Sequence, residues 1–335
     1  MNKKIFKNKR IVLVGGAGFI GHNLAIHLKK RGADVSIIDN LQVNHLGEIS
    51  LNKYNNSTLY LNFLYERLDL LRKQEIPLHV IDARDYSILC KQINLLKPNV
   101  LIHLAAVAHA QKANKDPYST FDHSTRTLEN TLDVCRDKNI HFIYFSSSMV
   151  YGQFENESVS EESPCKPLGI YGALKFSGEK LVIAYNQVFD LKYTIIRPSA
   201  LYGERCVSRR VSQVFIENSI KNNAFCINGT GEDSLDFTYI NDLLNGVELI
   251  IKNKASTNQT FNLTYGKASK INFLAKVIKN YFPKVKITYE KKDKLMPERG
   301  TLDISKAKKL LSYNPKHNLE KGIEKYINWY SKSFK

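Results

Sequence analysis

Cysteine is scarce in this sequence, and its few cysteines have no regular spacing. They form an odd set of five and include no Cys-x-x-Cys pair; they are Cys90, Cys135, Cys165, Cys206 and Cys226. A disulfide framework uses an even number of cysteines, and a zinc knuckle uses closely spaced pairs. The composition therefore argues against both classes and favours a reducing compartment, the cytoplasm.

Long apolar runs are also missing. The longest, residues 99–108 and 140–151, are broken by polar residues well before the ~18 to 20 apolar residues that cross a bilayer. The basic start of the chain is followed by only four apolar residues, Ile11–Val14, and by no plausible cleavage region, so we do not interpret it as a signal peptide. We expect no membrane span.

Acidic residues are outnumbered, with 32 against 49 basic residues and a net charge of +17. Such an excess can indicate nucleic acid, an anionic membrane surface or an anionic small substrate as partner. The basic residues are scattered, however, and short clusters at 208–211 and 291–294 lie within ordinary helix and strand patterns. We expect a dispersed, solvated positive surface, with neither nucleic acid nor membrane as partner.

With 335 residues, 43% of them hydrophobic, the chain can bury a substantial core, and its strand and helix patterns alternate. Strands are expected at 10–16, 34–40, 76–85, 99–108, 140–148 and 193–203, and helices at 19–32, 85–98, 119–139 and 171–189. This order predicts an α/β fold, a Rossmann-type doubly wound parallel sheet.

Two regions depart from the simple alternation. Residues 46–76 form an unusually long connection, within which 60–74 has a helical pattern. After about residue 203 the alternation loosens, with helices expected at 212–223, 271–282 and 319–332. We expect residues 1–203, with some later segments returning, to form a nucleotide-binding domain, and 204–335 to form mainly a smaller substrate-binding lobe.

A glycine-rich stretch lies between the first strand and the first helix. Gly16, Gly18 and Gly21 have the G-x-G-x-x-G spacing, and Gly15 starts a second series at three-residue steps. Small residues let the backbone approach a pyrophosphate, whose charge the helix amides favour. Taken alone, the same pattern also fits a plain tight turn.

Asp39 ends the second strand, near the ~20-residue offset at which a carboxylate binds the adenosine ribose of a dinucleotide. A carboxylate there repels a 2′-phosphate, which favours NAD over NADP. The alternative is that Asp39 caps a turn.

Tyr171 and Lys175 are four residues apart on an expected helix and therefore share a face. A nearby ammonium stabilises a phenolate and brings tyrosine, with its reference pKa of ~10, toward proton transfer at neutral pH. The serines at 146–148 end the fifth strand, where a hydroxyl can hydrogen-bond a substrate oxygen. An ordinary surface pair and a serine-rich helix cap are the alternatives.

Taken together, these motifs resemble the extended short-chain dehydrogenase/reductase family, in its nucleotide-sugar epimerase and dehydratase branch. The resemblance covers nearly the whole chain and rests on nine stretches in the expected order, residues 15–21, 37–40, 82–85, 101–110, 145–152, 171–175, 195–203, 235–242 and 299–311.

The resemblance implies that Tyr171 is the catalytic base, that Lys175 holds the nicotinamide ribose and lowers the tyrosine pKa, and that Ser147 hydrogen-bonds the reacting oxygen. The implied cofactor is NAD. Besides Tyr171 and Lys175, the residues expected to bind it are Gly15, Gly18, Phe19, Ile20, Gly21, Asp39, Asn40, Asp82, Ala83, Leu104, Ala105, Ala106 and Pro198.

Some positions depart from the family pattern. Sugar dehydratases of this branch have an acidic residue where this chain has Met149, and a methionine cannot transfer a proton. Dehydration and decarboxylation are therefore disfavoured. Ser124 and Thr127 stand near positions where the family usually has Asn and Gly, and Leu235 replaces an arginine expected to contact the diphosphate.

The remaining cationic residues are expected to replace that contact. Arg299 stands at its matching position, and Arg205, Arg209 or Arg210 can compensate for Leu235. We expect the substrate to be bound by Ser148, Arg205, Arg209 and Arg299. His103, His109 and His123 lack paired spacing for a metal, so no metal is expected; His109 or Gln111 is a further substrate contact.

The expected function is an NAD-dependent nucleotide-sugar 4-epimerase that acts through a transient 4-keto intermediate. A nucleotide-sugar 4-dehydrogenase or a keto-sugar reductase of the same family is the alternative. A non-catalytic NAD-binding redox sensor is more distant, because Tyr171 and Lys175 are both present. Residues 119–136 and 172–189 resemble helices that pair across a two-fold axis in this family, which implies a homodimer.

Overall fold

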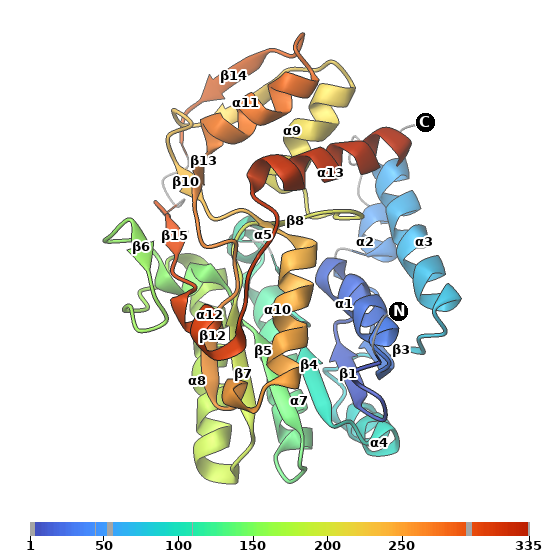
Figure 1. Cartoon of the computed structure of the whole chain (residues 1–335). Helices are drawn as coiled ribbons and strands as arrows, with labels where there is room; N and C mark the ends of the chain where they lie inside the picture. The colour runs from blue at the N-terminus through green and yellow to red at the C-terminus, as the bar shows by residue number, and fades with distance from the viewer. Residues whose placement is uncertain (1–3, 44, 52–55, 109, 293–296, 334–335) are drawn as a thin grey trace.

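The computed structural model describes residues 4–43, 45–51, 56–108, 110–292 and 297–333. Its central element is a seven-stranded parallel sheet of order β12-β7-β5-β4-β1-β2-β3 (Figure 1). The strands are β1 (Arg10–Val14), β2 (Asp34–Asp39), β3 (Leu78–Val80), β4 (Val100–His103), β5 (His141–Phe145), β7 (Tyr193–Arg197) and β12 (Gln259–Asn262). The predicted doubly wound fold is confirmed, and the order reverses between β1 and β4.

Helices cover both faces of the sheet. One buried cluster joins the sheet to α4 (Tyr86–Leu96), α7 (Thr127–Cys135) and α8 (Gly169–Phe189). A second joins it to α1 (Phe19–Lys30) and α10 (Ile240–Lys252). The strands between them are buried on both faces, as a parallel sheet requires.

The single helix predicted at 119–139 is wrong in detail. The structure has α6 (Pro117–Phe121), then a π-helical segment η1 (Asp122–Arg126), then α7, which ends at Cys135. Asp116 starts α6 by accepting a hydrogen bond from the Ser119 amide at 3.0 Å. Hydrophobic periodicity carries no signal for an i→i+5 turn, so the sequence could not place this widening, a feature found frequently at functional sites.

The long connection at 46–76 contains two helices, α2 (Leu46–Leu51) and α3 (Ser57–Lys73). α3 packs on α1 and reaches the C-terminal helix α13 (Leu319–Ser333), where the rings of Phe63 and Trp329 lie 4.6 Å apart between centroids. Figure 1 shows α3 rising beside α1 to this end of the molecule.

The upper part of Figure 1 holds α9 (Val211–Ile220), α11 (Ile271–Tyr281) and the pair β9 (Phe225–Asn228) and β14 (Ile287–Glu290). The remaining elements are short. They are α5 (Ala110–Lys115), α12 (Ser305–Leu311), η2 (Ser148–Tyr151), η3 (Lys254–Ser256), β6 (Ser158–Val159), β8 (Leu201–Tyr202), β10 (Ser234–Leu235), β11 (Thr238–Tyr239), β13 (Ser269–Lys270) and β15 (Thr301–Leu302).

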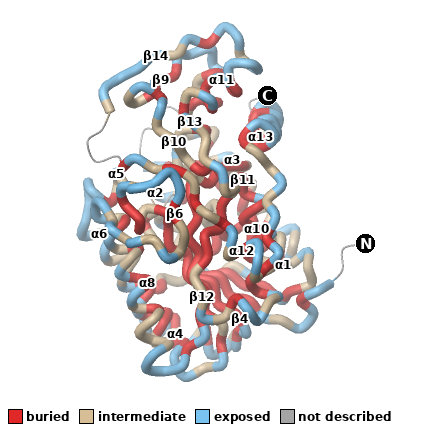
Figure 2. Tube along the Cα trace, turned by 60° about the vertical axis from the view of Figure 1, so that its left-hand side comes forward, coloured by how far each residue is buried: buried red, intermediate tan, exposed pale blue. Residues whose placement is uncertain are grey.

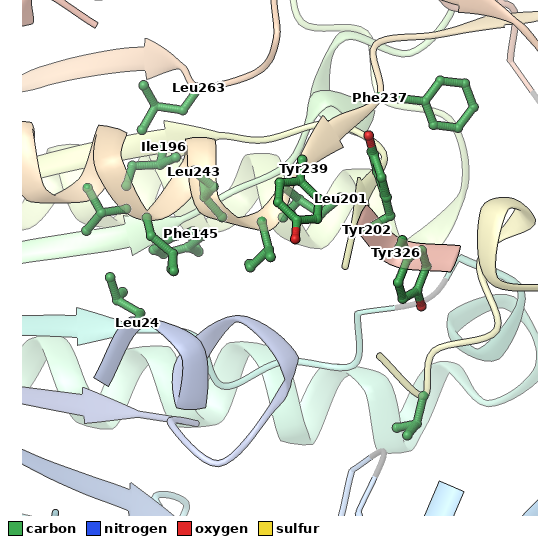
Figure 3. Close-up of a cluster of buried hydrophobic side chains, with 14 of the residues drawn as sticks. Leu24, Phe145, Ile196, Leu201, Tyr202, Phe237, Tyr239, Leu243, Leu263 and Tyr326 are labelled. Carbon is green, nitrogen blue, oxygen red and sulfur yellow. The ribbon is translucent and has the colours of Figure 1, made fainter. Parts of the chain in front are cut away.

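One buried cluster links the sheet to this upper part. In Figure 2 the buried residues concentrate along the middle of the molecule and the exposed ones on the outer helices. Figure 3 shows Phe145 and Ile196 of the sheet near Leu243 of α10, with Tyr202 and Tyr326 further along the same cluster. Because the core is continuous across residue 203, the division of the chain there stays a prediction.

Candidate active site

Two adjoining cavities lie at the carboxyl ends of the parallel strands. The smaller, of about 140 Å³, follows β1, β2 and β4, and the larger, of about 660 Å³, follows β5 and β7 and reaches α9 and β9. Their linings share five residues, namely Ile20, Leu104, Ala106, Ala108 and Arg210. This is the edge at which doubly wound sheets bind ligands.

The glycine stretch forms a close turn against the neighbouring strand. Gly15 has φ +78°, and a Cβ atom there would lie 2.5 Å from the amide nitrogen of Ala105. A Cβ atom on Gly21 would lie 2.4 Å from the carbonyl oxygen of Gly16. Gly18 caps α1 without a side-chain hydrogen bond, so the first amides of the helix point toward the cavity as donors for an anion.

Asp39 lies in the smaller cavity and also fixes its loops. Its two carboxylate oxygens accept hydrogen bonds from the amides of Ala17 and Leu41, each at 2.9 Å, and burial raises its pKa. Asp39 therefore does cap a turn, as the alternative interpretation expected. Its predicted contact with the adenosine ribose stays a prediction.

The adenine-side residues form a second cluster. Arg84 pairs with Asp82 and lowers the pKa of that carboxyl to about 2, while Asn40 donates to Asp82 at 3.1 Å. Arg84 also donates to Asp122 of η1 at 2.6 Å. No motif singled out Arg84, although it stands within the stretch 82–85 that carries the family resemblance.

The structure brings the expected cofactor residues together. Lining the smaller cavity are Gly15, Gly18, Phe19, Ile20, Gly21, Asp39, Asn40, Asp82, Ala83, Leu104, Ala105 and Ala106. Tyr171, Lys175 and Pro198 line the larger cavity instead. A glycine cradle, free helix amides and a carboxylate beside one cavity are the groups that a dinucleotide needs, so these residues fit NAD.

Tyr171 and Ser147 meet in the larger cavity. Both line it, and the hydroxyl of Ser147 accepts a hydrogen bond from the amide of Met149 at 3.2 Å. The serine thus caps η2 and lines the same cavity as the phenol. Burial raises the pKa of Tyr171, and the cation of Arg210 and the nearby hydroxyl of Ser147 oppose that rise.

Lys175 is buried one helical turn from Tyr171, and its ammonium donates to the carbonyl oxygen of Phe145 at 2.7 Å. Burial lowers the pKa of Lys175 to about 8, while the carboxylate of Glu179 opposes this change. Among the cations, Arg210 is the one that lowers the pKa of Tyr171 here, and the role that the resemblance implies for Lys175 stays a prediction.

A buried polar network that sequence reasoning missed supports the catalytic helix. Glu179 accepts from Ser146 at 2.5 Å and forms a two-fold ion pair with Arg197, at 2.9 and 2.7 Å. Arg197 also donates to the hydroxyl of Tyr151, which donates to Asn262 of β12. Lys175 and Glu179 are spaced i,i+4 on one helix, and this spacing is the only feature of the sequence that indicated the network.

The arginines expected to bind substrate separate into different places. Arg209, Arg210 and Arg299 line the larger cavity with Leu235, and the buried Nε atoms of Arg210 and Arg299 have no hydrogen-bond partner. Arg210 and burial lower the pKa of Arg299 to about 10. Two such neighbouring guanidinium groups suit a diphosphate, a doubly charged anion.

Arg205 is not brought to this cavity. It donates to Glu66 at 3.1 Å, to Asn23 at 2.9 Å and to the ring of His22 at 3.0 Å, on the far side of the glycine loop. Its φ of +62° is a left-handed backbone conformation that the sequence did not reveal.

The other expected residues are placed as follows. Ser148, Met149 and Gln111 line the larger cavity, and His123 and Thr127 line the smaller one. Ser124 accepts from the amide of Val107 at 3.2 Å. His109 lies outside the described residues. Within the described ranges, no group of three or more potential metal ligands occurs, and no helix is long and apolar enough to cross a membrane.

Comparisons with known proteins agree with this arrangement. The model of the NAD dependent epimerase/dehydratase family matches residues 11–264. A UDP-glucuronate 4-epimerase of Thermodesulfobacterium geofontis is 28% identical over 330 residues, which cover 95% of each chain.

Two solved structures show the same fold. The UDP-glucuronic acid 4-epimerase of Bacillus cereus, solved with UDP-glucuronic acid and NAD, has a TM-score of 0.85 and 24% identity, covering 96% of this chain and 99% of that one. The UDP-N-acetylglucosamine 4-epimerase of Methanobrevibacter ruminantium has a TM-score of 0.83 and 24% identity, covering 98% and 99%.

Proposed function

Since this chain belongs to the NAD-dependent epimerase/dehydratase family, we propose that it is an enzyme that inverts C4 of a UDP-sugar. The observation that carries the proposal is that Tyr171, Ser147 and Lys175 line one cavity, which adjoins the dinucleotide cradle. The same cavity is lined by two arginines whose buried Nε atoms have no hydrogen-bond partner. The relatives named above are UDP-sugar epimerases, which supports uridine as the base of the substrate's nucleotide.

Each residue has a distinct task in this reaction. Tyr171 takes the proton of the C4 hydroxyl and later returns it to the C4 oxygen. Ser147, which lines the same cavity, donates a hydrogen bond to that oxygen. Lys175, held by the Phe145 carbonyl one helical turn from the phenol, contacts the nicotinamide ribose. Bound NAD would supply the acceptor for the C4 hydride and the donor that returns it to the opposite face of C4.

Arg210 and Arg299 hold the diphosphate and so fix the nucleotide while the sugar turns. The turning sugar needs room, and the larger cavity supplies about 660 Å³. Met149 lines the same cavity and has no proton to transfer, which supports simple epimerisation over loss of water.

The test is a comparison of Tyr171→Phe with Tyr185→Phe, a matched change on the same helix at a tyrosine whose ring packs on Phe189. Product is followed by NMR with UDP-glucose, UDP-glucuronic acid and UDP-N-acetylglucosamine. We expect kcat to fall about 10²- to 10⁴-fold for Tyr171→Phe and to stay near the original value for the control.

The products distinguish the alternatives. A C4 epimer without accumulated reduced cofactor supports the proposal, and stoichiometric reduced cofactor supports the 4-dehydrogenase. Turnover that survives Tyr171→Phe contradicts the assigned base. If the unaltered protein binds NAD and converts none of the sugars, the result supports the alternative of a non-catalytic redox sensor.

We also propose a cytoplasmic homodimer that pairs through α6 and α8. Both helices carry exposed apolar side chains, Tyr118 and Phe121 on α6 and Val188 on α8, and all five cysteines are free thiols, as a reducing compartment favours. Sedimentation equilibrium of the unaltered chain and of Val188→Asp tests the dimer. A monomer at micromolar concentration in the unaltered chain contradicts it.

A further inference from the structure

Helix α3 carries an arginine that lines the dinucleotide cavity. Arg67 lines the smaller cavity together with Gly15, Gly18 and Asp39, yet only 1% of its surface is exposed. A charge buried this deeply is costly unless it is paired. Among the residues that the structure describes, no carboxylate forms an ion pair with it.

The guanidinium of Arg67 is only partly satisfied. Its Nε and one Nη donate to the carbonyl oxygen of Arg205, which holds the group in a fixed orientation. The other nitrogen, Nη1, is buried and has no hydrogen-bond partner. A donor that is oriented, charged and unpaired in the wall of a cavity indicates an acceptor that belongs to a ligand.

The surroundings of Arg67 are cationic, which indicates that the ligand carries a negative charge. Burial and, to a smaller extent, the cation of Arg205 lower the pKa of Arg67 to about 10; Cys206 opposes this change, and Asp39 is the one carboxylate among the opposing groups. Both Asp39 oxygens already accept backbone amides. An anion in the cavity would therefore relieve an excess of positive charge that the protein does not neutralise itself.

His22 is held neutral in the same cluster. Its Nδ1 contacts the carbonyl oxygen of Gly18 at 2.8 Å, and its Nε2 accepts from Arg205 at 3.0 Å. A carbonyl can only accept and an arginine can only donate, so the proton sits on Nδ1. Burial together with Arg67 and Arg205 lowers the pKa of His22. The histidine thus links Arg205, whose carbonyl orients Arg67, to the glycine turn.

We propose that Arg67 binds the pyrophosphate of the bound dinucleotide through Nη1, and that α3 is therefore part of the cofactor site. α3 is also fixed to the substrate side of the molecule, because Tyr60 donates to Glu217 of α9 at 2.7 Å. The proposal rests on NAD binding by the family and goes beyond the proposed sugar chemistry.

The test uses the full-length chain freed of bound nucleotide and measures calorimetric affinities for NAD, ADP-ribose, ADP and adenosine. We expect Arg67→Met to weaken the binding of the three phosphate-bearing ligands about 10- to 100-fold. The affinity for adenosine should change less than about two-fold. Arg72→Met is the matched control, because Arg72 lies on the same helix with 76% of its side chain exposed. It should leave all four affinities unchanged.

If Arg67→Met weakens the binding of adenosine and ADP equally, or weakens neither, the proposal is overturned. If Arg67→Met does not fold, a crystal structure of the unaltered chain with NAD replaces the binding assay. A phosphate oxygen within hydrogen-bond distance of Nη1 supports the proposal, and its absence overturns it. Neither experiment uses a UDP-sugar or measures turnover, so both remain decisive if the proposed epimerase reaction fails.

Discussion

Replacing His103 with leucine is expected to flatten the acid side of the stability curve. His103 ends β4 in the middle of the sheet, with 1% of its surface exposed, and its ring lies 6.1 Å from the ring of Phe142. Burial and the nearby Lys175 ammonium lower its pKa to about 3. The native protein therefore keeps this ring neutral between pH 7.5 and 4.5.

The sign follows from proton uptake. Below pH ~6.5 the unfolded chain protonates His103 and the native protein does not, so unfolding is favoured as the pH falls. Well below pH ~6.5 each pH unit is worth about 1.36 kcal/mol, and the free energy of unfolding loses about 2.7 kcal/mol between pH 7.5 and 4.5 through this residue. The His103→Leu variant takes up no proton at this position, so it does not lose this part of its free energy of unfolding.

The assay is urea unfolding followed by the fluorescence of the single tryptophan at pH 7.5 and 4.5. The difference in unfolding free energy between His103→Leu and the original chain should shift by about 2.7 kcal/mol in favour of the variant on acidification. Ile102→Val, a buried substitution next to it without a titratable group, should show the same difference at both pH values. An equal, pH-independent difference for His103→Leu would refute the reasoning.

Three further predictions concern the helix α8 and the cofactor loop. Glu179→Gln leaves Arg197 as a buried cation, so the free energy of unfolding should fall by about 3 to 5 kcal/mol in urea titrations, and a loss below about 1 kcal/mol would contradict this role. Gly178→Ala places a Cβ atom 2.2 Å from the hydroxyl oxygen of Tyr144, so unfolding should become easier by about 1 to 3 kcal/mol, and Tyr144→Phe should recover part of that loss. Asp39→Ala removes the carboxylate that repels a 2′-phosphate, so the ratio of the Kd values for NADP and NAD should fall, and an unchanged ratio would exclude Asp39 as the selecting group.

Local sequence patterns determined the sheet and the ends of its strands. Buried parallel strands appear as short apolar runs, and the G-x-G-x-x-G spacing marks the turn after the first of them, so the positions of Gly15, Gly18 and Asp39 at one edge followed from the order of elements. The i,i+4 spacing of Tyr171 and Lys175 likewise placed both side chains on one face of α8.

Contacts between segments distant in the sequence were decided only by the tertiary structure. The pair Glu179–Arg197 joins a helix to a strand, and Arg67 meets the carbonyl of Arg205 across 138 positions. The backbone turn at Arg205 sends its side chain behind the glycine loop, while Arg210 enters the substrate cavity. Composition and spacing record which charges a chain possesses, but the direction of a side chain depends on backbone angles and packing that are set only when the whole core is assembled.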